Sequence, residues 1–172
     1  MTPPDESAIR QLRQAVRDAA GRPEVREAIE RIYTDLVAEV AERRPVCVVS
    51  GRCCRFEEYG HRLFVTTAEL AAFVHGLEAV PRTPALEEAI RNWDGTGCPF
   101  QVAKLCGVHA LRPFGCRIFF CDATATQWQN DAYEAFHARL KRLHEELAVD
   151  YFYVEWRQAL RAVVPELAPA AI

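Results

Sequence analysis

Seven cysteines are the residues of this chain best suited to chemistry, and all of them fall in its middle part. They are Cys47, Cys53, Cys54, Cys98, Cys106, Cys116 and Cys121. Cysteines that serve only as small buried hydrophobic residues should also occur in the helical segments at either end, and none does. The clustering therefore favours one shared site, where thiolates bind zinc or an iron–sulfur cluster.

The intervals between these cysteines do not reproduce a standard motif. No C-x-x-C pair occurs, which excludes ordinary zinc-finger spacing, the bacterial ferredoxin pattern and the thioredoxin-like redox pair. The odd number of cysteines argues against complete disulfide pairing. A metal site, a thiol redox couple and plain packing therefore stay open, with the metal site favoured.

Basic and imidazole side chains lie close to the thiols in sequence. Arg112 and Arg117 are predicted to lower thiol pKa values and to offset the negative charge of several thiolates. His109 is either a further metal ligand or a residue that packs and hydrogen-bonds locally. His137 and His144 share one face of a long helix with a lysine, and we expect both at the surface.

Composition limits the class of protein. A chain of 172 residues is long enough for one domain with a real core. Half of the residues are hydrophobic and the formal net charge is −3, so we expect no nucleic-acid and no membrane partner. The start of the chain lacks the apolar segment of a signal peptide, and no apolar run approaches the roughly 18 residues that span a bilayer. We therefore expect a cytoplasmic protein, where thiols stay reduced.

Helices at both ends must position the cysteines. Apolar residues recur at three- and four-residue steps over residues 23–43 and 126–148, which predicts two long amphipathic helices. Thr66 and Glu69 have capping-box spacing, so another helix should follow through about Gly76. Residues 85–93 predict a short helix, residues 98–121 short strands and turns, and residues 151–156 a strand or the start of the last helix. Residues 165–172 are expected to be a frayed tail.

These elements predict a mainly α protein with minor β structure (α+β). We expect a single domain over residues 1–172, in which a helical scaffold surrounds a central, irregular, cysteine-rich metal site. Its cysteine-cluster core covers residues 47–121, and the flanking helices cover residues 1–44 and 126–167.

The central segment resembles the YkgJ-type cysteine-cluster family, whose signature is CxxCxxCC-like and which is described as a zinc- or iron-chelating domain. The first match is Ser50-Gly51-Arg52-Cys53-Cys54, and the second runs from Cys106 through Arg112-Pro113 to Cys116-Arg117, with Cys98 before it and Cys121 after it. Two positions depart from the pattern: Ser50 stands where the family usually has cysteine, and His109 stands where it often has tyrosine.

The resemblance implies metal binding through these cysteines, with zinc or an iron–sulfur cluster as the cofactor. A related domain occurs in flagellin lysine N-methylases, so a cluster-dependent enzyme such as a protein N-methylase-like transferase is an alternative. No glycine-rich nucleotide loop supports an S-adenosylmethionine site. A thiol redox switch or a closed structural metal site would also use these thiols, whereas a vacant pocket beside the cysteines would favour an enzyme. The sequence identifies neither a substrate nor a protein partner.

Overall fold

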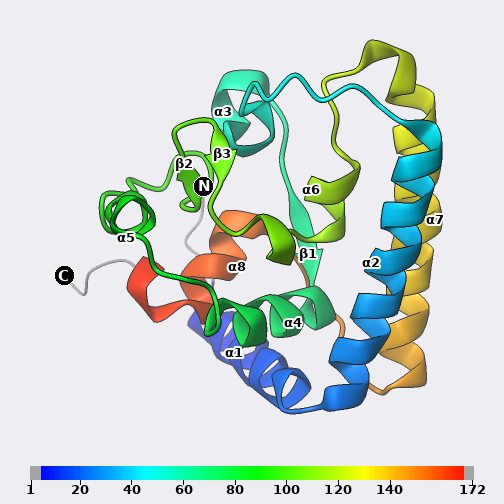
Figure 1. Cartoon of the computed structure of the whole chain (residues 1–172). Coiled ribbons are helices and arrows are strands. Elements are labelled where there is room, and N and C mark those ends of the chain that lie inside the picture. Colours follow the sequence, from blue (N-terminus) through cyan, green and yellow to red (C-terminus); the bar gives the residue numbers. More distant parts are fainter. Residues whose placement is uncertain (1–4, 169–172) are drawn as a thin grey trace.

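Helices make up most of the computed structural model, which describes residues 5–168 (Figure 1). In chain order they are α1 (Glu6–Ala20), α2 (Pro23–Arg43), α3 (Phe56–Tyr59), α4 (Thr67–Leu77), α5 (Pro84–Arg91), α6 (Phe114–Ile118), α7 (Thr126–Glu146) and α8 (Trp156–Val163). The short 3₁₀ turns are η1 (Arg52–Cys54), η2 (His109–Leu111), η3 (Ala123–Ala125) and η4 (Pro165–Leu167). The expectation of a mainly helical protein is confirmed.

Two small antiparallel sheets complete the fold. In the first, β1 (Phe64–Thr66) pairs with β4 (Tyr153–Glu155), so that Val65 lies opposite Val154. In the second, β2 (Gln101–Val102) pairs with β3 (Leu105–Cys106) in a tight hairpin. The first sheet joins the middle of the chain to its C-terminal part, and the second carries one of the cysteines.

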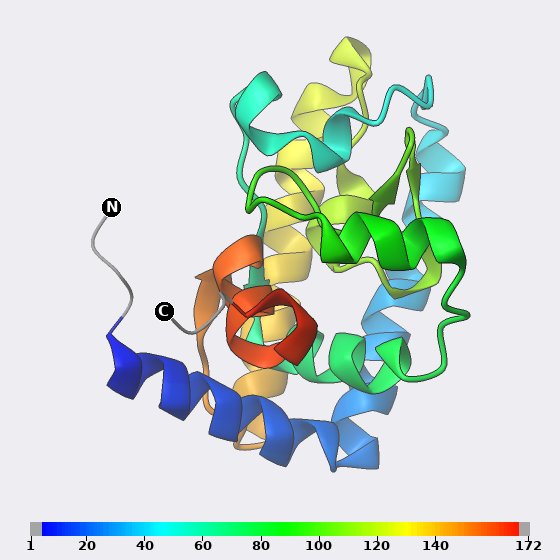
Figure 2. The same ribbon diagram turned by 90° about the vertical axis from the view of Figure 1, so that its left-hand side faces the viewer.

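The molecule consists of a helical scaffold at one end and an irregular region at the other. The long helices α2 and α7 lie side by side, and α1, α4 and α8 pack together at one end of the molecule (Figures 1 and 2). The segment after α2, α3, the β2–β3 hairpin and α6 lie at the other end. Trp156, Phe100 and Phe114 are among the largest fully buried side chains. The core therefore extends from the helical scaffold up to the cysteine-bearing segments.

Several sequence expectations need correction. His144 is buried and does not lie at the surface. Its ring nitrogens lie within hydrogen-bonding distance of the Ala68 amide nitrogen and the Val149 carbonyl oxygen. Residues 98–121 contain the helix α6 as well as strands and turns. The expected frayed tail is ordered as far as residue 168, since the buried Leu167 anchors it, and residues 169–172 lie outside the described part.

No helix among residues 5–168 combines the length and the hydropathy that a membrane-spanning helix needs.

Glu69 is a buried carboxylate that joins three helices. The capping box at the start of α4 is confirmed: Glu69 Oε2 accepts from the Thr66 backbone and hydroxyl, and the Thr66 hydroxyl accepts from the Glu69 amide. Its other oxygen accepts from the Tyr33 hydroxyl on α2 at 3.1 Å and from the Phe114 amide on α6 at 3.0 Å. Burial raises the pKa of Glu69. Because Phe114 begins the helix that carries Cys116, this carboxylate fixes part of the cysteine region to the scaffold.

Glu69→Gln is expected to lower the free energy of unfolding by about 2 kcal/mol, because an amide nitrogen would face donors that now find an acceptor. Urea denaturation followed by circular dichroism measures the change. Glu88→Gln is the matched control, since Glu88 is exposed on α5 and its side chain makes no hydrogen bond within residues 5–168. Equal stability of the Glu69→Gln variant and the parent would contradict this role.

Candidate functional site

A cavity of about 210 Å³ brings the cysteine-bearing segments together. Its walls come from the segment after α2, η1, the β2–β3 hairpin, η2, α6 and the residues that follow α6. All seven cysteines line it: Cys47, Cys53, Cys54, Cys98, Cys106, Cys116 and Cys121. His109, Arg112 and Trp156 line it as well, whereas Arg117 does not. We call this space the cysteine cavity.

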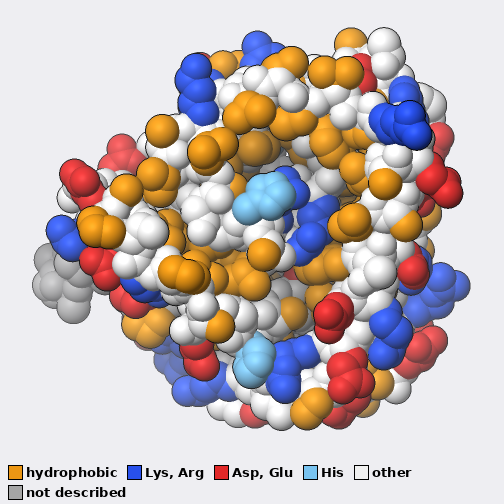
Figure 3. All heavy atoms as spheres, viewed as in Figure 1, with side chains coloured by type: hydrophobic (Ala, Val, Ile, Leu, Met, Phe, Trp, Pro, Cys, Tyr) orange, Lys and Arg blue, Asp and Glu red, His pale blue; other side chains and the backbone are white. Residues whose placement is uncertain are grey.

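The surface above this region is hollowed. On the face seen in Figure 1, hydrophobic side chains, a class that includes cysteine in this view, surround a depression that holds histidine and Lys or Arg side chains (Figure 3). His109 is exposed, and Cys47 is the one exposed thiol among the seven. The cysteine cavity therefore lies near solvent on one side and against the core at Trp156 on the other.

The thiols are free and not yet gathered at one point. None of the seven forms a disulfide. The Cys53 and Cys54 sulfurs are 3.9 Å apart, and the Cys121 sulfur is 3.5 Å from the Ser50 hydroxyl. Within residues 5–168, no group of three or more His, Cys, Asp or Glu side chains is arranged to hold a metal ion. The site is a cavity ringed by thiols, and a shared metal centre would require several of these side chains to change rotamer.

Glycines let two cysteine loops lie against each other. The Cys98 amide donates to the Cys54 carbonyl at 2.8 Å, and a Cβ at Gly97 would lie 2.9 Å from that carbonyl oxygen. Gly51 has φ +73°, and the Gln101 side chain donates to its carbonyl at 2.9 Å. Both glycines adopt the left-handed conformation, which other residues adopt at a cost. The turns on either side of Cys53–Cys54 and Cys98 therefore depend on glycine.

Arg117 braces the second cysteine segment from outside the cavity. Its guanidinium donates to the Arg112 and Ala110 carbonyl oxygens, each at 2.6 Å, and lies 4.3 Å from the centre of the Tyr33 ring. Pro113 is the N-cap of α6, with φ −64°. Arg117 thus holds the backbone turn that leads into Cys116, whereas the Arg112 side chain lines the cavity itself.

Interactions between neighbouring thiols shift the pKa values of three cysteines in different directions. The hydrogen bond from Cys54 lowers the pKa of Cys53 to about 6. The neighbouring Cys54 thiol, and to a lesser extent the Trp156 indole, lower the pKa of Cys98. Interactions with the Cys53 and Cys98 sulfurs, together with burial, raise the pKa of Cys54. At neutral pH the protein therefore presents a thiolate at Cys53, and Cys98 is more acidic than an ordinary thiol.

Two other cysteines of the cavity are weaker acids than an ordinary thiol. Burial raises the pKa of Cys106 to about 11, and it also raises the pKa of Cys116 well above the usual value for a thiol. The positive charge of Arg112 acts in the opposite direction on Cys53, Cys106 and Cys116. Partial burial and the two nearby arginines lower the pKa of His109, so its imidazole is neutral at pH 7. A neutral imidazole is able to bind a metal ion.

Trp156 is a part of the site that the sequence did not single out, and His61 lies beside the site. Trp156 is buried, and its indole nitrogen has no hydrogen-bond partner within residues 5–168. The indole nevertheless helps to lower the pKa of Cys98, and Trp156 and Cys98 line the same cavity. His61 is stacked on Phe119 with ring centres 4.7 Å apart. Neither residue has a cysteine next to it in sequence, so only the tertiary structure reveals these contacts.

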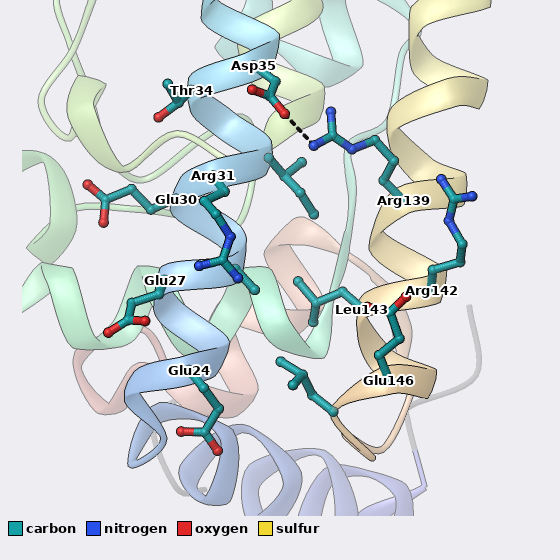
Figure 4. A pocket seen from close by; sticks show the side chains of 13 residues that line it. Glu24, Glu27, Glu30, Arg31, Thr34, Asp35, Arg139, Arg142, Leu143 and Glu146 are labelled. Atoms are coloured by element: carbon teal, nitrogen blue, oxygen red, sulfur yellow. Dashed lines mark hydrogen bonds and ion pairs between the residues drawn. The ribbon is translucent and has the colours of Figure 1, made fainter.

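Two other hollows are lined by no cysteine. A groove of about 820 Å³ lies between α2 and α7, with charged side chains on its walls and an ion pair between Asp35 and Arg139 (Figure 4). A pocket of about 590 Å³ lies between α2, α4 and η2, where Arg117 lines one wall. Neither holds the soft donors that a zinc or iron–sulfur site needs.

Fold and site together define a mainly helical protein with a cavity lined by free cysteines. Comparison with models of protein families, with curated proteins and with solved structures finds no match to this chain.

Proposed function

We propose that this protein binds a metal centre through thiolates of the cysteine cavity. The observation that supports the proposal is that seven free cysteines, from segments up to 74 positions apart (121 − 47), all line one cavity. Thiolates are the ligands that zinc and iron–sulfur clusters prefer. Cys53 and Cys98, whose pKa values are lowered, are the first ligands to bind; Cys54, Cys106 and Cys116 would release protons on binding.

The size of the cavity favours an iron–sulfur cluster over a single zinc ion. A volume of about 210 Å³ is on the order of ten times what one water molecule needs, and a single ion is smaller still. Seven thiols also exceed the four that a tetrahedral zinc site uses. Zinc binding would require the thiols to close in by a greater distance than cluster binding would.

The deciding experiment is elemental analysis and visible absorption of protein purified without oxygen. We expect iron and acid-labile sulfide together with a brown colour. Colourless protein with stoichiometric zinc would select the tetrahedral site instead. Folded protein that contains neither metal, and that neither iron with sulfide nor zinc can load, would overturn the proposal.

Trp156→Phe is expected to weaken metal affinity roughly 10- to 100-fold, because hydrogen bonds to ligand atoms tune a site to about that extent. The reason is the loss of the indole N–H that helps to lower the pKa of Cys98, while an aromatic ring is retained. Competition with a chelator measures the affinity. Trp128→Phe is the control, since the Trp128 indole donates to Glu39 outside the cysteine cavity. Equal affinity of the two variants would contradict the assignment.

A thiol redox switch is the second candidate, supported by the Cys53 thiolate that lies 3.9 Å from the Cys54 sulfur. Such a switch requires an external oxidant that accepts two electrons as the disulfide forms. Counting free thiols before and after oxidation and again after reduction tests it. A fully reversible loss of two thiols in metal-free protein would support the switch over the metal site.

A further inference from the structure

A second pocket adjoins the cysteine cavity. Its volume is about 360 Å³, and it lies between the segment from α3 to β1, α6 and the first turns of α7. This volume falls at the lower end of the range for small-molecule sites, roughly 300 to 1,000 Å³. Its aromatic lining residues are Phe56, Phe64, Phe119, Phe120 and Tyr133. We call it the aromatic pocket.

The aromatic pocket and the cysteine cavity share a wall. Cys53 and Cys116 line both spaces, together with Phe56, Phe119 and Phe120. A molecule in the aromatic pocket would therefore lie against two of the proposed metal ligands. A metal site with a purely structural role has no use for such a pocket, whereas a site that acts on a bound molecule requires one.

Several polar side chains line the aromatic pocket, and two of them have free hydrogen-bond donors. Arg62 is its one charged lining residue among residues 5–168, and it forms no ion pair or hydrogen bond there. The Gln129 side-chain oxygen accepts from the Phe120 amide at 2.8 Å, so the Gln129 amide nitrogen is left to donate. The His61 ring is held between Phe56 and Phe119, and its buried Nδ1 has no partner within the described residues.

These observations specify a ligand. Flat aromatic walls favour a ring that stacks, and the volume suits a molecule with one ring. An arginine and a free amide donor in the lining of one pocket favour a carboxylate, since charge-assisted hydrogen bonds to a guanidinium are the stronger kind. We infer that the aromatic pocket binds a small aromatic carboxylate, held by Arg62 and Gln129, against the wall that contains Cys53 and Cys116. A role for this carboxylate as a substrate depends on the proposed metal site, but its binding to the aromatic pocket does not.

The test is calorimetric titration of the protein, purified without oxygen, with 3-phenylpropanoate and with its neutral amide. We expect saturable binding of one 3-phenylpropanoate per chain, about 10-fold tighter than binding of the amide. Arg62→Gln should remove that preference, and Asn130→Trp should block both compounds, because Asn130 lines the same pocket from α7. Arg91→Gln, on the exposed part of α5, should bind like the parent.

Metal content measured in the same samples separates this inference from the proposed function. Metal-loaded protein that binds no 3-phenylpropanoate, or that binds it equally well after Arg62→Gln, would overturn the inference and leave the metal site in place. Metal-free protein that binds it in an Arg62-dependent manner would support the aromatic pocket and count only against the metal proposal. In metal-loaded protein, a change in visible absorption on saturation would support contact with the shared wall.

Discussion

Substitution of Cys98 by serine is expected to remove most of the metal that the protein binds. Cys98 interacts with several other groups of the site. The Cys54 thiol and the Trp156 indole lower its pKa, and its charge raises the pKa of Cys106 and Cys116. Serine keeps the size but offers a hydroxyl, which is a poor ligand for zinc or iron. The loss of affinity should be at least ~10-fold, the lower bound for residues that act only through ligands.

Elemental analysis of oxygen-free preparations and competition with a chelator measure this effect. Cys47→Ser is the comparison, because Cys47 is exposed and does not contribute to the pKa shifts of the other thiols. We expect the Cys47→Ser variant to keep most of its metal. Cys98→Ser protein with the metal content and chelator resistance of the parent would show that Cys98 is not a ligand.

The helical scaffold follows from local sequence patterns. The apolar spacing over residues 23–43 and the Thr66–Glu69 pair are sufficient to predict α2 and the start of α4, since both signals act within a few turns of one helix. Burial of His144 was not predicted, because its partners come from α4 and from the loop after α7. A pattern within one helix shows which face is polar in composition, but not which polar groups find partners inside.

The candidate site was predictable as a set of residues rather than as an arrangement. Clustering of the cysteines between positions 47 and 121 indicated a shared site, and all seven line one cavity. The contributions of Trp156 and His61 depend on packing between distant segments, which spacing does not encode. Metal binding by these thiols stays a prediction, and so does the choice of ligands among them and His109.

The contact between the two cysteine loops leads to the second large effect, which we expect from Gly97→Ala. Gly97 has φ +58°, and its added Cβ would lie 2.9 Å from the Cys54 carbonyl oxygen, a backbone atom that moves only with its loop. That carbonyl accepts the hydrogen bond from the Cys98 amide. The substitution should therefore separate Cys54 from Cys98 and lower the free energy of unfolding by about 2 to 4 kcal/mol.

Gly60→Ala is a matched control for the strain of the left-handed conformation. Gly60 has φ +66°, close to the value at Gly97, but a Cβ there would meet nothing within 4 Å. Its substitution should cost only about 1 to 2 kcal/mol. The difference between the two variants isolates the steric contact with the Cys54 loop.

Measuring the metal content of both variants tests the role of that contact in the proposed metal site. Gly97→Ala protein should lose metal in addition to stability, whereas Gly60→Ala protein should keep its metal, because only Gly97 lies against a loop that carries two cysteines. Denaturant unfolding and elemental analysis of both variants provide the two measurements. Equal losses in the two variants would mean that the contact between Gly97 and Cys54 does not hold the cysteine loops together, and the hydrogen bond from Cys98 to Cys54 would then not be what shapes the cavity.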